Sequence, residues 1–160
     1  SLVEEVIRSN EQQKLRVAAR IKELLQGLSG KKIAVLGLAF KAETDDVRES
    51  PSLSIVPALM KENADTALHD PKAADNFCGQ LQEASGTDRV TVYPGVYEAV
   101  EGADGLVILT EWNEYRNMDL QRIRSLMKGN LIYDTRNVLD REEAAALGFR
   151  YYGTGRAGRY

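Results

Sequence analysis

Basic residues follow the ends of several apolar segments in this chain. The apolar run 33–36 ends at Gly37 and is followed by a long loop that carries Lys41 and Arg48. In α/β proteins, an apolar strand that ends at a glycine and leads into a helix is a common phosphate-binding arrangement. Long loops inside compact domains are usually functional. The stretch therefore predicts a site for an anionic, nucleotide-like ligand.

Polar side chains also follow the other predicted strands. They are His69 and Asp70 after the second, Thr110, Glu111 and Trp112 after the fourth, and Asp134, Thr135, Arg136 and Asn137 after the fifth. The carboxyl ends of parallel strands share one edge of a sheet, so Lys41, Arg48 and Arg136 are expected to converge there. A lysine supplies a point charge and an arginine a two-pronged donor, a combination that suits a diphosphate.

Each of these candidates also has a structural interpretation. The turn Gly37-Leu38-Ala39 lacks the second and third glycines of the dinucleotide fingerprint, which argues against a dinucleotide at this turn. Arg48 and Arg136 could equally be salt-bridge partners. Asp45 and Asp46 are interpreted as acids that face solvent or pair with Arg48.

Four further residues are interpreted as structural. His69 is expected at a strand end, and Asp70 is expected to start a turn. Trp112 is expected to pack in the interior or at an interface, and Cys78 to be a buried, inert thiol on a helix.

The apolar pattern predicts an alternation of strands and helices. A long helix is expected over 2–28, strands over 32–37, 66–69, 90–93, 105–109, 131–133 and 149–152, and helices over 51–62, 72–84, 95–101, 120–127 and 142–147. Ser50 is the expected N-cap of the helix over 51–62, Pro57 is expected to kink or end it early, and Asp119 should cap the helix over 120–127. Residues 153–160 are expected to form a mobile tail. The predicted fold is a doubly wound α/β domain with a mostly parallel, Rossmann-like sheet and helices on both faces, preceded by a long N-terminal helix.

Composition limits the classes of function. The chain has 160 residues, enough for one domain, and its net charge of −3 argues against a nucleic-acid partner or a membrane partner. One cysteine excludes an internal disulfide and fits a reducing cytoplasm, and one histidine with no ligand spacing predicts no metal site.

The start at Ser1 suggests a fragment of a longer protein. An enzyme domain that acts on a nucleotide remains possible, as does a non-catalytic regulatory α/β module. The lack of an acidic cluster at the first and third strand ends disfavours a phospho-acceptor module.

Several segments resemble one known family. The segment GLAFKAETDDVRESPS (37–52) is similar to the hallmark segment of the C-terminal domain in the UDP-glucose/GDP-mannose dehydrogenase family. The resemblance continues through LHDPKA (68–73), ADGLVILTEWNEYR (103–116), IYDTRNVLD (132–140) and GFRYYGTGR (148–156). The opening EEVIRSNEQQKLRV (4–17) resembles the end of the family's long central helix.

The resemblance implies a division of the chain and a set of partners. Residues 1–29 would end the central linking and dimerisation helix, and residues 30–160 would form the C-terminal nucleotide-sugar-binding domain. NAD is the implied cofactor, bound mainly by an N-terminal domain outside this sequence, and a cytoplasmic homodimer is implied. UDP-glucose is the nucleotide sugar expected first, while GDP-mannose and N-acetylated UDP-sugars stay open. Cys78 does not match the family's catalytic cysteine motif, so no catalytic residue is assigned and the fragment alone is expected to be inactive.

The resemblance also assigns four site residues. Phe40 and Lys41 match an aromatic-lysine pair that contacts the nucleotide sugar, and Arg136 in DTRN matches an arginine that reaches the substrate. Arg48 in DDVRES matches an arginine that reaches across the cleft to NAD. Ala42 stands where the family usually has proline, which removes no functional group. The alternative is a non-catalytic UDP-binding or structural α/β module.

Overall fold

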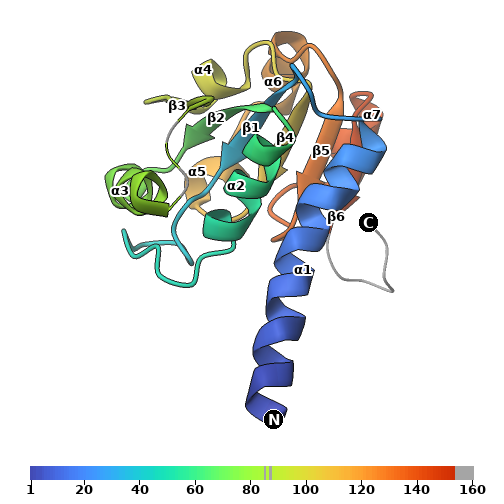
Figure 1. The fold of residues 1–160 in the computed structure, drawn as a ribbon. Coiled ribbons are helices and arrows are strands. Elements are labelled where there is room, and N and C mark those ends of the chain that lie inside the picture. The colour runs from blue at the N-terminus through green and yellow to red at the C-terminus, as the bar shows by residue number, and fades with distance from the viewer. Residues whose placement is uncertain (85, 87, 154–160) are drawn as a thin grey trace.

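A parallel β-sheet forms the centre of the computed structural model (Figure 1). The structure describes the backbone of residues 1–84, 86 and 88–153, and the side chains of these residues except 6–11, 83 and 84. Within this part of the chain there are six strands: β1 (Lys32–Leu36), β2 (Asp65–His69), β3 (Val90–Val92), β4 (Gly105–Ile108), β5 (Leu131–Asp134) and β6 (Arg150–Gly153). Their order is β3-β2-β1-β4-β5-β6, and each neighbouring pair is parallel. The predicted doubly wound parallel sheet is confirmed.

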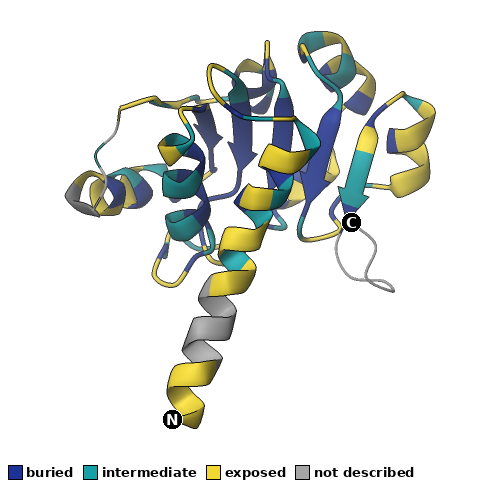
Figure 2. Ribbon diagram, turned by 45° about the vertical axis from the view of Figure 1, so that its right-hand side comes forward, coloured by how far each residue is buried: buried dark blue, intermediate teal, exposed yellow. Residues whose placement is uncertain are grey.

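The four central strands are buried on both faces, as Figure 2 shows. Residues Gly105–Ile108 and Leu131–Asp134 are buried throughout, which matches their continuous apolar sequence. The order of the strands reverses direction between β1 and β4. In doubly wound sheets the ligand crevice lies at the carboxyl edge beside such a reversal.

Helices cover the sheet. They are α1 (Leu2–Leu24), α2 (Ser52–Lys61), α3 (Ala74–Ala84), α4 (Val96–Val100), α5 (Asn113–Arg116), α6 (Leu120–Leu126) and α7 (Arg141–Ala146). The helices α1 and α2 pack against each other on the face turned to the viewer in Figure 1. The N-terminal end of α1 projects away from the sheet, where residues 1–5 are exposed (Figure 2). None of the helices in the described part of the chain has the length and apolarity needed to span a bilayer.

The first helix is shorter than the sequence predicts. It ends at Leu24 instead of residue 28, because Gln26 and Gly27 adopt positive φ angles of 57° and 105°. The Gly27 N–H donates to the Lys22 carbonyl at 2.9 Å and closes the helix end. Leu28 continues the apolar pattern but is buried after the turn, which is why periodicity alone extended the helix.

The second helix differs from the prediction in its first residue and in the effect of Pro57. It begins at Ser52, one residue later than expected, and Pro51 occupies the N-cap position without a side-chain cap. The Ser50 hydroxyl still accepts the Ser52 N–H at 3.2 Å. Pro57 does not end the helix early, since α2 continues to Lys61 with Ile55 buried in the core. Burial of the apolar face offsets the single hydrogen bond that a proline removes.

The other boundaries agree with the prediction to within one or two residues. Asp119 caps α6, since its Oδ1 accepts the Arg122 N–H at 3.1 Å. The short helix α5 was not predicted, because four residues are too few to display a helical period. The tail predicted over 153–160 falls outside the described residues, except for Gly153, which ends β6.

Candidate functional site

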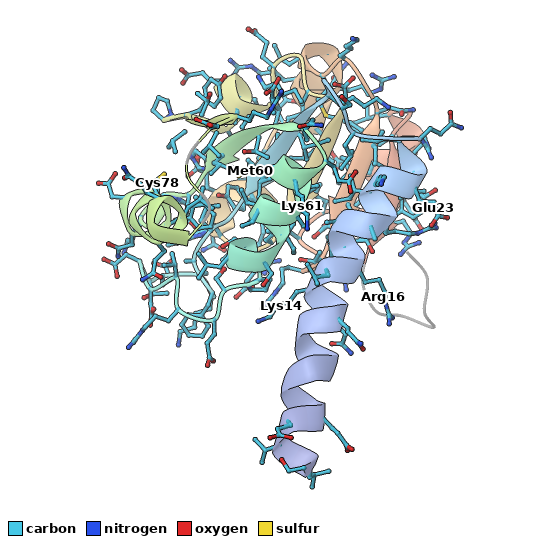
Figure 3. The ribbon with its side chains drawn as sticks, in the orientation of Figure 1. Lys14, Arg16, Glu23, Met60, Lys61 and Cys78 are labelled. Carbon is cyan, nitrogen blue, oxygen red and sulfur yellow. The ribbon has the colours of Figure 1, made fainter. Side chains whose placement is uncertain are left out.

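A cleft of about 690 Å³ opens at the carboxyl edge of the sheet beside β4 and β5. Three parts of the chain line it: Gln13, Lys14 and Val17 of α1, residues 49–51 and 53–55 at the start of α2, and Leu109, Thr135 and Arg136 after the two strands. Lys14 points from α1 toward the side of α2, whereas Arg16 points away (Figure 3). The cleft thus carries cationic groups on two walls, at the edge where open α/β sheets bind ligands.

The loop after β5 holds Arg136 on a fixed backbone. The Asp134 carboxylate is fully buried and accepts the N–H of Arg136 at 3.1 Å, the N–H of Leu139 at 2.9 Å and the hydroxyl of Tyr151 at 2.7 Å. Thr135 donates both its N–H (3.0 Å) and its hydroxyl (2.8 Å) to the Ile108 carbonyl. Burial, with the bond to Asp134, raises the pKa of Tyr151, so its hydroxyl stays a donor. The backbone at Arg136 is therefore tied both to β4 and to its own strand.

The guanidinium of Arg136 faces a carboxylate from the neighbouring strand end. Its Nη2 lies 2.7 Å from Oε2 of Glu111, and the two side chains are 41% and 25% exposed. This Glu111 oxygen is buried and accepts no hydrogen bond among the described residues, so the contact is an ion pair without hydrogen-bond geometry. Sequence reasoning placed Glu111 at a strand end but did not pair it with Arg136.

The point where the strand order reverses is closely packed. Gly37 has a φ of +100°, and a Cβ there would lie 2.5 Å from Cβ of Thr110. The Thr110 hydroxyl donates to the Ala39 carbonyl at 2.8 Å. The glycine predicted from the sequence as a phosphate-loop feature therefore serves the close approach of the β1 and β4 ends.

Asp70 ties the start of the long loop to two other segments. Its Oδ2 accepts the N–H groups of Leu38 (2.7 Å) and Ala39 (3.0 Å) and the indole N–H of Trp112 (3.2 Å). Its Oδ1 accepts the N–H groups of residues 72 and 73, both at 2.8 Å, which confirms the predicted turn. Trp112 is 4% exposed, as its predicted packing role requires.

Phe40 and Lys41 lie together on this loop. The Lys41 ammonium is 5.3 Å from the centroid of the Phe40 ring, a cation–π distance, and Phe40 is one of the large apolar residues exposed at the surface. Neither residue lines the cleft that contains Arg136.

Arg48 lies in a different place from Arg136. It lines a second cleft of about 660 Å³ between the long loop and α3. Its Nε and Nη2 donate to the two carboxylate oxygens of Asp46 at 3.0 and 2.9 Å, which lowers the pKa of Asp46 to about 2. The expected convergence of Lys41, Arg48 and Arg136 is not seen in one cleft: Arg136 lines the first cleft, Arg48 lines the second, and Lys41 lines neither.

His69 and Cys78 have structural surroundings. His69 is 3% exposed, its Nδ1 lies 2.9 Å from the Tyr115 hydroxyl, and that hydroxyl donates to the His69 carbonyl at 3.1 Å. Burial lowers the pKa of His69, although Glu114 and Asp70 oppose the shift. Cys78 on α3 is half-buried, and burial raises its thiol pKa, so the thiolate is disfavoured.

The fold and the cleft define an α/β domain of the type that binds ligands at the carboxyl edge of a parallel sheet. Residues 34–141 match the UDP binding domain of the UDP-glucose/GDP-mannose dehydrogenase family. The chain belongs to this family, and the resemblance expected from its motifs is confirmed.

Curated relatives are similar over nearly the whole chain. A UDP-glucose 6-dehydrogenase from Pseudomonas aeruginosa is 42% identical over 148 residues, which cover 92% of this chain and 33% of that protein. A UDP-glucose 6-dehydrogenase from Bacillus subtilis is 38% identical and covers 97% of this chain and 32% of that protein. The chain thus spans about a third of the length of these relatives.

Solved structures share the fold. An NDP-N-acetyl-D-galactosaminuronic acid dehydrogenase from Methanosarcina mazei matches with a TM-score of 0.74 and 29% identity, covering 91% of this chain and 29% of that one. A UDP-glucose dehydrogenase from Pyrobaculum islandicum matches with a TM-score of 0.65 and 32% identity, covering 79% and 27%. These structures include enzymes for different nucleotide sugars.

Proposed function

We propose that this chain is the nucleotide-sugar-binding part of an NAD-dependent UDP-glucose 6-dehydrogenase, an enzyme that oxidises UDP-glucose to UDP-glucuronate. The observation that carries the proposal is the cleft at the carboxyl edge, with Arg136 fixed in its wall and Lys14 on the opposite helix. Support also comes from the UDP-glucose 6-dehydrogenases that match over most of the chain. In this proposal the chain binds and orients the ligand, and the oxidising chemistry belongs to NAD and to residues outside this sequence.

Arg136, Lys41 and Phe40 are the proposed substrate-binding residues. Arg136 would donate a fork of N–H groups to the diphosphate, and Lys41 would add a point charge. The exposed ring of Phe40 offers an apolar surface to the nucleotide sugar. Lys41 does not line the cleft that contains Arg136, so in this proposal it approaches the diphosphate from the long loop after β1.

Arg48 is the proposed cofactor-binding residue. Its guanidinium is 81% exposed and held by Asp46 in a cleft separate from that of Arg136. A second anion can therefore bind there without competing for Arg136. NAD would occupy this position from an N-terminal domain of the same protein.

The proposed organisation follows the same division. Residues 1–29 end a central helix that joins two copies into a dimer, and residues 30–160 form the nucleotide-sugar-binding domain of a cytoplasmic enzyme. The exposed start of α1, with Leu2 and Val3 among its large exposed apolar residues, is consistent with a partner there.

The test measures UDP binding and NAD-dependent oxidation of UDP-glucose in the longer protein that contains this chain. A hydrogen bond to a charged group is worth roughly 1.5–3 kcal/mol. Arg136→Ala or Lys41→Ala should therefore weaken UDP-glucose binding about ten- to a hundredfold. Lys61→Ala, at the far end of α2, is the control for loss of one positive charge and should leave binding unchanged. Unchanged affinity in both site variants would overturn the assignment.

A second measurement tests Arg48 and the enzymatic role. Arg48→Ala should raise the KM for NAD strongly and leave UDP-sugar binding nearly unchanged. The isolated 160-residue chain should produce no NADH from UDP-glucose. A longer protein that binds UDP but never oxidises any nucleotide sugar would favour the alternative, a non-catalytic UDP-binding module.

A further inference from the structure

Glu111 and Arg136 belong to two backbone segments that hydrogen bonds hold in place. The segment after β4 is held by the Leu109 N–H, which donates to the Leu36 carbonyl at 2.8 Å, and by Thr110, which bonds to the loop after β1. The segment after β5 is held by Asp134 and Thr135 through the bonds described above. The backbone of Arg136 is therefore fixed, and only its long side chain can still change conformation.

The contact with Glu111 limits that freedom. It engages Nη2 at 2.7 Å, at one end of a guanidinium that carries five N–H donors in a planar fork. The side chain of Arg136 remains 41% exposed and lines the cleft. A phosphate can therefore approach the part of the fork that faces the cleft while Glu111 keeps its contact.

The burial of the Glu111 oxygen argues that the contact persists when a ligand binds. Oε2 accepts no hydrogen bond among the described residues, so the Arg136 charge is its main compensation at this position. A buried carboxylate oxygen without compensation is costly. An incoming phosphate would consequently add to the ion pair instead of replacing Glu111.

We propose that Glu111 is a positioning residue that orders the Arg136 guanidinium for a nucleoside diphosphate. This inference rests on the proposed function, in which Arg136 binds the diphosphate. Ordering one long side chain in advance should improve affinity roughly two- to tenfold. A carboxylate that only added negative charge near the cleft would instead weaken the binding of an anion. The two effects predict opposite signs when the charge of Glu111 is removed.

The experiment compares UDP with uridine as inhibitors of the longer enzyme, for the wild type and for Glu111→Gln. The variant should weaken UDP binding two- to tenfold and leave uridine binding unchanged, because uridine lacks the diphosphate. Glu114→Gln is the matched control. It removes the same charge three residues away, from a side chain that contacts His69 and not Arg136, and should leave both ligands unaffected.

Two further variants close the test. In an Arg136→Ala background, Glu111→Gln should cause no further loss of UDP affinity, since a positioning residue acts only through its partner. Glu111→Asp keeps the charge but shortens the reach, and should recover part of the affinity lost in Glu111→Gln. If Glu111→Gln unfolds, Glu111→Asp is compared with the wild type and should itself weaken UDP binding and leave uridine binding unchanged, because the shorter carboxylate orders Arg136 less well.

The outcomes separate the two proposals. Tighter or unchanged UDP binding in Glu111→Gln overturns the positioning role, and so does an equal loss of affinity in the Arg136→Ala background. If Arg136→Ala itself leaves UDP binding unchanged, the assignment of Arg136 under the proposed function fails, and the positioning role fails with it.

Discussion

Gly37 is a position where a single added methyl group should strongly destabilise the fold, because a close neighbour and a positive φ coincide there. An alanine Cβ would lie 2.5 Å from both Cβ and Oγ1 of Thr110 and 2.6 Å from its backbone N, and the φ of +100° disfavours any residue with a Cβ. The backbone strain costs roughly 1–2 kcal/mol, and overpacking at a rigid contact costs about 1–3 kcal/mol more. For a domain of this size, each kcal/mol shifts Tm by about 2–4 °C.

Gly37→Ala should therefore lower the free energy of unfolding by about 2–5 kcal/mol and Tm by roughly 5–20 °C. The assay is urea and thermal unfolding followed by circular dichroism. Gly30→Ala is the matched control, because Gly30 also has a positive φ, +74°, but an added Cβ would have nothing within 4 Å. The control should lose only the roughly 1–2 kcal/mol of unfolding free energy that backbone strain costs. Equal losses in the two variants would refute the close approach of the β1 and β4 ends as the reason for a glycine at position 37.

Three other predictions concern the buried polar groups near β2. Asp70→Ala removes the acceptor of four backbone N–H groups and an indole N–H, so it should lower the urea-unfolding free energy by roughly 3–5 kcal/mol; a loss below 1 kcal/mol would contradict its linking role. Tyr115→Phe leaves the buried Nδ1 of His69 without its hydroxyl partner and should cost about 1–3 kcal/mol in the same assay. Burial lowers the pKa of His69, so the unfolded chain binds its proton more readily. The stability that the neutral form of His69 contributes should be fully present above the ordinary histidine pKa of about 6.5, and it should be lost as the pH drops below that value. The fall in Tm between pH 7.5 and 5.5 should shrink in His69→Asn, and an unchanged slope would assign the effect to other groups.

Local signals in the sequence were sufficient for the layout of the fold. The alternation of buried apolar strands with helical segments predicted the parallel sheet, because strands covered on both faces must be apolar throughout. Asp70 and Asp119 were recognised as turn and cap residues from their side-chain chemistry, which acts within three residues of itself. Helix ends were less certain, as the true end of α1 at Leu24 illustrates.

Which residues meet in the site depends on contacts between parts of the chain that are far apart in the sequence. The sequence identified Arg136, Glu111 and Lys41 as residues that follow strands, but it could not say which of them meet. Glu111 reaches Arg136 because β4 and β5 are neighbours in the sheet, whereas Lys41, near the start of the long loop after β1, does not line the same cleft. Lys14 lies on α1. The helical period of the sequence identifies the apolar face of this helix, but it does not show that Lys14 lines the cleft.

The sequence by itself determined the strands, the helices, the family motifs and the edge of the sheet at which chemistry is expected. These depend on period, on turn residues and on the common direction of parallel strands, all of which act locally or repeat along the chain. Only the tertiary structure decided that Gly37 supports close packing against Thr110, that the carboxylates of Asp134 and Glu111 contact the backbone and the guanidinium of Arg136, and that Arg48 lies in a separate cleft. The physical reason is the strand order, which brings residues distant in sequence within a few ångströms and which no local pattern of side chains encodes.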